Sequence, residues 1–116
     1  MKKPIIGITL DSEKKKTYSK FPWYALRENY LTSLTKFNAI PFPLLHEKKY
    51  IDDFCHLIDG LIITGGDFDI HPKLYKTSNT QSKNIKNKRT NFELNIFNKF
   101  FKYNKPILGI CGGAQL

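Results

Sequence analysis

The sequence has few cysteines and no long apolar run. Of its 116 residues only two are cysteine, Cys55 and Cys111, and no Cys-x-x-Cys or Cys/His spacing indicates a zinc site or a disulfide framework. The apolar stretch that follows Pro4 is too short for a signal peptide, and nowhere do about 18 apolar residues follow one another. We therefore expect a cytoplasmic protein with reduced thiols and no membrane partner.

Arginine is also scarce, although the chain is basic. Nineteen Lys and Arg against ten Asp and Glu give a net charge of +9, but only two of the nineteen are arginine. Direct readout of phosphates and guanines favours the bidentate guanidinium, so we expect no nucleic-acid partner.

The composition predicts a folded chain, because 41% of the residues are hydrophobic and 25% are charged. The length of the chain suits one domain or part of one.

Three short apolar segments predict strands that are buried on both faces. They are nearly continuous runs of apolar and β-branched residues, at 3–10, 59–64 and 106–111. A fourth extended segment, 40–45, contains two prolines and is therefore an edge strand at best.

Helical spacing of apolar residues separates these strands. The first helix is predicted from a stripe made of Trp23, Leu26, Tyr30, Leu34 and Phe37. Residues 50–57 predict a short helix in which Cys55 packs, 91–103 predict a longer one, and 67–88 read as a long polar loop. This alternation predicts an α/β fold with a mostly parallel sheet and flanking helices.

A glycine-flanked cysteine follows the last predicted strand. In the segment Gly109-Ile110-Cys111-Gly112-Gly113 the side chain of Cys111 stands at a strand-to-helix turn, which is typical of a nucleophile elbow. A helix beginning after Cys111 would favour its thiolate and would place the N–H of Gly112 at a developing oxyanion. Tight packing at a strand end is the alternative interpretation of the same pattern.

A second glycine pair, Gly65-Gly66, ends the preceding predicted strand. Because parallel strands end at one edge of a sheet, where ligands bind, both glycine segments should meet there, and the N–H of Gly66 is a candidate oxyanion donor. Asp67, Asp69 and His71 alternate as divalent-metal ligands do, but turn chemistry is the simpler explanation of the same residues. No Gly-Lys-Ser/Thr follows, which excludes a P-loop. We expect no metal and no cofactor.

Five segments resemble the class I glutamine amidotransferase-like family, in particular the peptidase C26 branch that includes γ-glutamyl-γ-aminobutyrate hydrolases. Pro4–Thr9 resembles the family's opening strand and Ile40–Leu44 its second. Asp59–Pro72 resembles the oxyanion-strand segment, Arg89–Glu93 the Arg-Asp-x-x-Glu helix start, and Pro106–Gln115 the Gly-x-Cys-x-Gly-x-Gln elbow. The resemblance covers nearly the whole chain.

This resemblance implies a flavodoxin-like amidotransferase core that is truncated after the elbow, so that residues 1–116 form a single incomplete domain. It implies that Cys111 is the nucleophile that attacks a small γ-glutamyl amide substrate. It also implies that Gly66 and Gly112 form the oxyanion hole and that Gly65 and Gln115 contact the bound glutamyl group.

The chain departs from the family pattern in three places. Gly112 stands where this branch usually has arginine, and Thr90 stands where it has aspartate. The family's downstream His and Glu, two residues apart, are missing, since this sequence ends five residues after Cys111. A local histidine such as His71 lacks an orienting carboxylate at suitable spacing.

Without that base, hydrolysis by this chain alone is not expected, because losing a general base removes about 10² to 10⁴ in rate. The alternative function is that of a non-catalytic remnant or partner-binding subunit. In either case we expect the chain to pair with a second polypeptide or to associate with itself.

Overall fold

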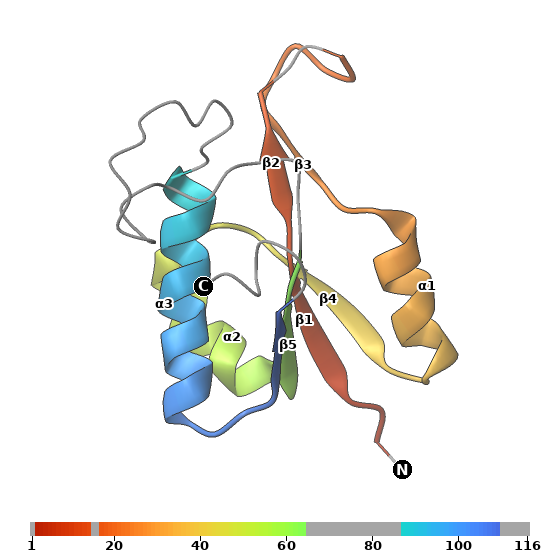
Figure 1. Ribbon diagram of the computed structural model, residues 1–116, viewed down its shortest axis with the longest axis vertical. Coiled ribbons are helices and arrows are strands. Elements are labelled where there is room, and N and C mark those ends of the chain that lie inside the picture. Colours follow the sequence, from red (N-terminus) through yellow and green to blue (C-terminus); the bar gives the residue numbers. More distant parts are fainter. Residues whose placement is uncertain (1, 15–16, 65–86, 110–116) are drawn as a thin grey trace.

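The computed structural model describes residues 2–14, 17–64 and 87–109, and its centre is a parallel sheet. The four strands lie in the order β4-β1-β5-β6. Their bounds are Ile5–Thr9 for β1, Ile40–Leu44 for β4, Gly60–Ile63 for β5 and Ile107–Gly109 for β6. All neighbouring pairs are parallel, as Figure 1 shows. The predicted α/β class and mostly parallel sheet are confirmed.

The two edges of this sheet differ in their capacity to pair. Ile40 N donates to Pro4 O, so the alternate residues Pro41 and Pro43 stand where an N–H would point away from β1. The prolines therefore stop further pairing at β4, which is an edge strand as predicted. At the other edge, Pro106 O accepts from Leu61 N, so the N–H and C=O of Ile107 point away from β5.

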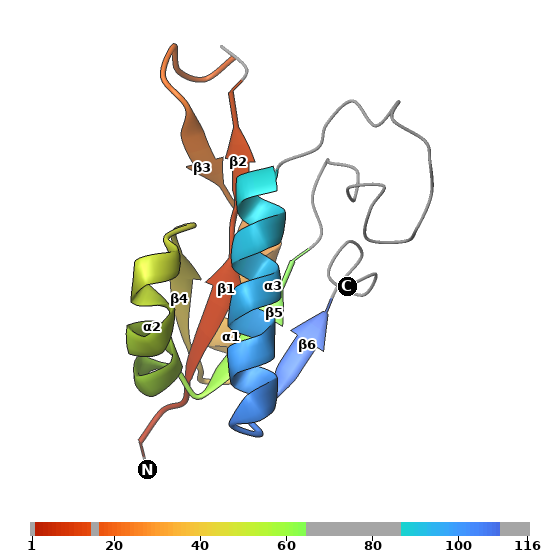
Figure 2. The ribbon, with the colours of Figure 1, turned by 90° about the vertical axis from the view of Figure 1, so that its left-hand side faces the viewer.

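Two helices cover one face of the sheet and carry the core. They are α2 (Ile51–Leu57), which follows the 3₁₀ turn η1 (Lys48–Tyr50), and α3 (Asn87–Lys102). Figure 2 shows both in front of the strands. The buried residues beneath them form one cluster, which includes Leu44, Phe54, Ile58, Leu61, Ile63, Phe92, Ile96 and Phe100. Cys55 is buried in it, as predicted.

The close contact between sheet and α2 depends on Gly7. A Cβ built on this residue would lie 2.3 Å from Ile58 Cδ1, so no larger residue fits unless Ile58 moves. At the end of α3, Lys105 Nζ donates to Ile58 O at 2.9 Å and to Cys55 O, which ties the turn before β6 to the end of α2. Asn104, with a φ of 56°, allows that turn.

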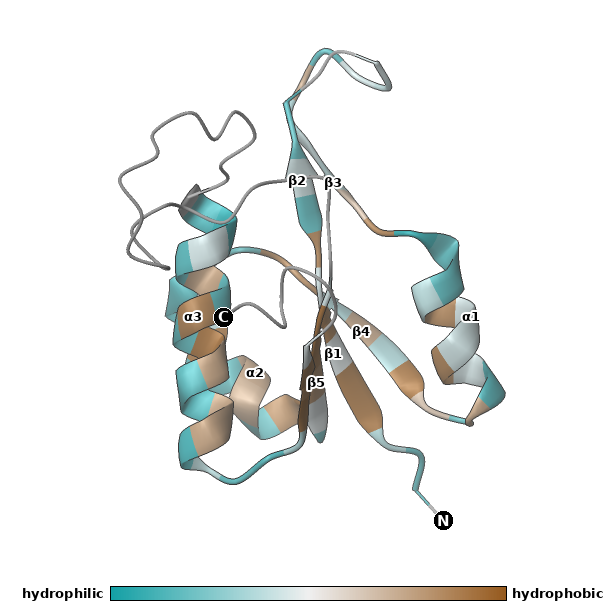
Figure 3. Cartoon of the chain, viewed as in Figure 1, coloured by the Kyte–Doolittle hydropathy of each residue, from teal (hydrophilic) through white to brown (hydrophobic). Residues whose placement is uncertain are grey.

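The opposite face is covered by α1 (Glu28–Lys36), which lies over β4 and contributes no buried residue. The predicted helix from Trp23 to Phe37 was too long. Trp23–Ala25 instead form β3, which pairs antiparallel with β2 (Asp11–Glu13), where no strand was predicted. Figure 3 shows how hydrophilic β2 is beside β1 and β5, which explains why no strand was expected there.

The predicted apolar stripe of α1 is wrong at both of its ends. Trp23 is only half-buried in a strand, and Phe37 follows the helix with 83% of its surface exposed. Asn38, with a φ of 61°, follows the end of the helix and turns the chain toward β4. Among the described residues, no helix is long and apolar enough to cross a membrane.

Candidate active site

The carboxyl ends of β5 and β6 lie side by side, and these are the two strands that lead to the predicted site. The register pairs Ile63 with Gly109. In the sequence, Thr64 directly precedes Gly65, and Cys111 follows Gly109 after one residue. The structure therefore brings together the chain positions from which both glycine segments start, as the parallel sheet predicted.

The predicted site residues themselves lie outside the described part of the chain. They are Cys111, Gly65, Gly66, Gly112 and Gln115. The alternative metal ligands Asp67, Asp69 and His71 fall in the same undescribed ranges. Within the described residues, no group of three or more His, Cys, Asp or Glu side chains is placed to hold a metal ion.

A buried polar cluster occupies this edge of the sheet in the described structure. Its centre is Arg89 in the first turn of α3, whose side chain has no exposed surface. Arg89 NH2 donates to Thr64 O at 2.7 Å and to Thr64 Oγ1 at 3.0 Å. Arg89 NH1 lies 3.2 Å from Asp11 Oδ1, and Nε lies 3.2 Å from Glu93 Oε2. One guanidinium thus links β5, β2 and α3.

Two threonines continue the cluster into the sheet. Thr64 N donates to Thr9 Oγ1 at 3.0 Å, and Thr64 Oγ1 donates to Thr9 O at 2.9 Å. Both residues are at most 1% exposed. Thr64 is the last described residue before Gly65. These bonds and those from Arg89 hold its backbone N–H, its backbone carbonyl and its side-chain hydroxyl. Such a fully bonded position cannot shift without leaving buried polar groups unpaired.

Burial controls the protonation of Glu93. Only 2% of this residue is exposed, and removal from water raises the pKa of its carboxyl above the ordinary value. Arg89 beside it opposes that rise, as do hydrogen bonds from Thr9 and Arg89. Glu93 is therefore a poor candidate for an exposed general base and a good partner for the guanidinium.

His46, which follows β4, is also buried near this edge. Its Nε2 lies 2.8 Å from Leu10 O, and since a carbonyl only accepts, Nε2 carries the hydrogen. The ring packs edge-on against Tyr24 and tilted against Phe92. Burial lowers the pKa of His46, so the ring is neutral. Its Nδ1 has no partner among the described residues.

None of the described histidines is placed as an oriented catalytic base. His46 is only 2% exposed, and its Nε2 is engaged by the backbone. His56 lies on the exposed side of α2, with Nδ1 2.7 Å from Asp52 O. Neither ring has a carboxylate bonded to it in the described structure. His71, the other histidine considered from the sequence, lies outside the described residues.

The sequence interpretation missed the role of Thr9, Asp11 and Glu93. A signal was present, because Arg89 and Glu93 occupy the same helical face as the buried Phe92 and Ile96. Charged residues at i and i+4 on an apolar face indicate a buried pair. The contact between Arg89 and Asp11 depends on the β2–β3 ribbon, so no spacing in the sequence predicts it.

Comparisons with known proteins show the family of the chain. The peptidase C26 family model matches residues 4–116. A glutamine amidotransferase-like protein of Rickettsia prowazekii is 45% identical over 98% of this chain and 42% of the relative. A glutamine amidotransferase-like YvdE homologue of Lactococcus lactis subsp. cremoris is 37% identical over 57% of this chain and 35% of the relative. The chain thus spans less than half the length of these relatives, and it belongs to the peptidase C26 family.

Proposed function

We propose that the chain supplies the nucleophile half of an enzyme that hydrolyses the C–N bond of a γ-glutamyl amide. The proposal is carried by the parallel ends of β5 and β6, which lead directly to Gly65-Gly66 and to the cysteine segment. Membership of the peptidase C26 family supports it, as does the glutamine amidotransferase-like name of the Rickettsia relative.

In this proposal the thiolate of Cys111 attacks the carbonyl carbon of the amide. The N–H groups of Gly66 and Gly112 stabilise the oxyanion of the tetrahedral intermediate, while Gly65 and Gln115 contact the glutamyl group. The C–N bond then breaks, and the amine leaves with a proton from a general acid. Water hydrolyses the resulting thioester, which releases glutamate and restores the thiol. Because this chemistry needs a free thiol, the reducing cytoplasm suits it.

The described cluster would serve this chemistry by fixing the oxyanion strand. Arg89 bonds the carbonyl of Thr64, and Thr9 accepts from its N–H, so the backbone before Gly65 is held from both sides. Precise placement of oxyanion donors matters because losing one donor costs about 10² to 10³ in kcat. Arg89 is therefore a positioning residue, since it acts through the backbone of Thr64.

The general base and the rest of the substrate site would come from residues other than these 116. The open edge of β6 and the exposed Leu108, with 56% of its surface accessible, support an association there with a second segment or polypeptide. In the alternative function, the chain is a non-catalytic partner-binding subunit. It would use the same surface for association but would not hydrolyse a substrate.

The test is complementation. The chain is coexpressed with the part of the Rickettsia relative that lies beyond the matched region, and glutamate release from γ-glutamyl-p-nitroanilide is measured. We expect no turnover by the chain alone, turnover by the complex, and loss of turnover in Cys111→Ala. A stable complex without turnover would favour the non-catalytic subunit. Turnover that survives in Cys111→Ala would refute the proposed nucleophile.

A further inference from the structure

The outward face of α3 carries a continuous row of cationic and amide side chains. Lys88, Asn91, Asn95, Asn98 and Lys102 follow one another at spacings of three and four, which places them on one side of the helix. All five are exposed. The opposite side of α3 is buried in the core, so this row is part of the surface that the helix presents to solvent.

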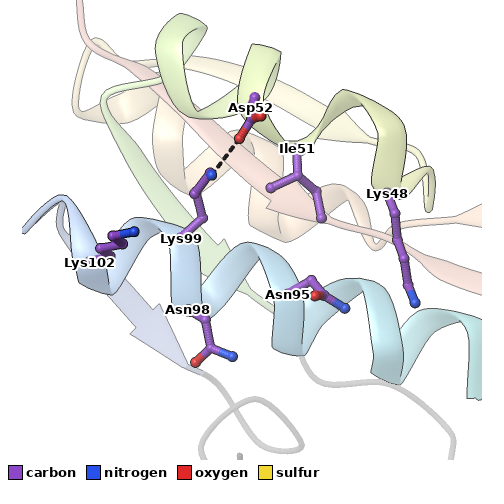
Figure 4. Close-up of a pocket in the computed structure, with 7 residues that line it drawn as sticks. All are labelled: Lys48, Ile51, Asp52, Asn95, Asn98, Lys99 and Lys102. Carbon is purple, nitrogen blue, oxygen red and sulfur yellow. Dashed lines mark ion pairs between the residues drawn. The ribbon is translucent and has the colours of Figure 1, made fainter.

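Two cavities lie between this row and the segment formed by η1 and α2. One, of about 340 Å³, is shown in Figure 4: Lys102, Asn98 and Asn95 come from α3, while Lys48 points toward it from η1. The other, of about 420 Å³, is lined by Lys49 and by the residues of α3 nearer its N-terminus. Lys48 lines both cavities, so they are neighbours, and the two together are here called the basic groove.

The basic groove has an excess of positive charge. Its lining contains five lysines and two carboxylates, those of Glu47 and Asp52. Each carboxylate already has a lysine partner: Lys99 Nζ lies 2.6 Å from Asp52 Oδ1, and Lys88 Nζ lies 3.6 Å from Glu47 Oε1. The lysines left without a carboxylate among the described residues are Lys48, Lys49 and Lys102.

We infer that the basic groove binds an extended acidic peptide segment of a partner protein. The unpaired lysines would pair with its carboxylates. The asparagines suit its backbone, because a side-chain amide both donates and accepts, as a peptide group does. Asn95 Nδ2 already donates to Asn91 O at 2.7 Å, which leaves its Oδ1 to accept a peptide N–H.

A nucleic-acid strand fits the same groove less well. The phosphodiester backbone only accepts hydrogen bonds, so it could pair with the lysines but not with the acceptor oxygens of the three asparagines. The basic groove contains no arginine, and the two aromatic rings in its lining, those of Phe92 and His46, are at most 2% exposed, so among the described residues it offers no surface on which bases can stack.

The test measures binding of a fluorescein-labelled, glutamate-rich octapeptide to the chain by fluorescence anisotropy at low salt. The comparison peptide has glutamine at every glutamate position. We expect saturable binding of the acidic peptide, and a Kd about five- to tenfold weaker in the double variant Lys48→Ala/Lys102→Ala, since each exposed pair contributes about 0.2 to 1 kcal/mol. A matched double variant, Lys3→Ala/Lys36→Ala, removes the same charge elsewhere and should bind as the unmodified chain does.

Three results would overturn the inference. They are absence of binding, an equal loss in both double variants, and tighter binding of a labelled oligothymidylate that competes with the peptide. As a second readout, amide NMR shifts caused by the peptide should concentrate on Asn91, Asn95 and Asn98. Since the basic groove does not involve Cys111, none of these results bears on the proposed hydrolysis.

Discussion

The two faces of the sheet are covered to very different degrees. On the α2 and α3 side, Phe92, Ile96 and Phe100 are fully buried against the strands. On the other side, α1 has no buried residue, and Leu108 of β6 is 56% exposed. Burial of apolar area is the main stabilising contribution to folding, at roughly 25 cal/mol per Å². We infer that the α2 and α3 side provides most of the stability of the chain and that the other side contributes less.

Removing the buried guanidinium should have the largest effect on folding. Arg89→Met keeps apolar bulk but leaves Glu93 and the carbonyl of Thr64 without their partner. Breaking a buried ion pair from one side costs about 3 to 5 kcal/mol, which is a large fraction of the stability of a small domain. Urea unfolding followed by circular dichroism measures it. Arg27→Met, at an exposed position, is the matched control and should change stability by less than about 0.5 kcal/mol. Equal effects would contradict the account.

The second largest effect on stability is expected from truncating side chains, and it should differ between the two faces of the sheet. Ile96→Ala leaves a cavity in the core and should lower the free energy of unfolding by about 3 kcal/mol. Leu34→Ala on α1 removes a similar side chain that is only half-buried, so we expect a loss of about 1 kcal/mol or less. Urea midpoints of the two variants provide the comparison. Similar losses would show that the faces contribute equally to stability.

The buried imidazole should make stability depend on pH. Burial lowers the pKa of His46 below 6.5, helped by the charges of Arg89 and Lys88 and opposed by Leu10 O and Asp11. The unfolded chain therefore binds a proton that the folded chain does not, and stability should fall as pH drops below about 6.5, by at most about 1.4 kcal/mol per pH unit.

Thermal melts over this pH range of the unmodified chain and of His46→Gln check the prediction. The variant should lack this part of the decline. His56→Gln, at an exposed position of α2, is the matched control for loss of an imidazole. An equal change in both variants would show that burial of His46 is not the cause.

The smallest expected effect on stability is at the open edge. Leu108→Thr replaces an exposed apolar side chain and keeps β-strand preference, so stability should change by less than about 0.5 kcal/mol. Self-association, however, should weaken if the β6 edge and its apolar side chain mediate it. Sedimentation velocity over a range of concentrations measures this. Unchanged self-association would place the contact elsewhere on the molecule.

Much of the fold was predictable because its signals are local. Continuous apolar runs identified β1, β5 and β6, and the prolines identified β4 as an edge strand. The predicted helix over 91–103 begins later than α3 because the first turn of α3 is polar and adds nothing to the apolar periodicity, although the family resemblance already indicated a helix start at Arg89–Glu93. The β2–β3 ribbon was missed because the polar strand Asp11–Glu13 gains its structure from a distant partner. Tertiary pairing of this kind leaves no periodicity in the sequence.

The site divides in the same way. The glycine and cysteine segments of the proposed site are contiguous motifs, so they can be proposed from the sequence alone. The cluster that links Arg89 to Thr64, Asp11 and Glu93 joins residues from three separate segments, and only the folded chain brings them together. The charged residues on the buried face of α3 indicated that a buried pair exists. The spacing of residues in the sequence did not show which residues outside the helix contact Arg89.

The reactivity of Cys111 tests the central claim most directly. The rate of its alkylation by iodoacetamide at neutral pH is measured by peptide mapping in the folded chain and in urea, with Cys55 as the internal reference. A preorganised nucleophile predicts that Cys111 reacts faster in the folded chain than in urea, whereas the buried Cys55 reacts more slowly when folded. A Cys111 that reacts no faster in the folded chain than in urea would contradict the proposed nucleophile.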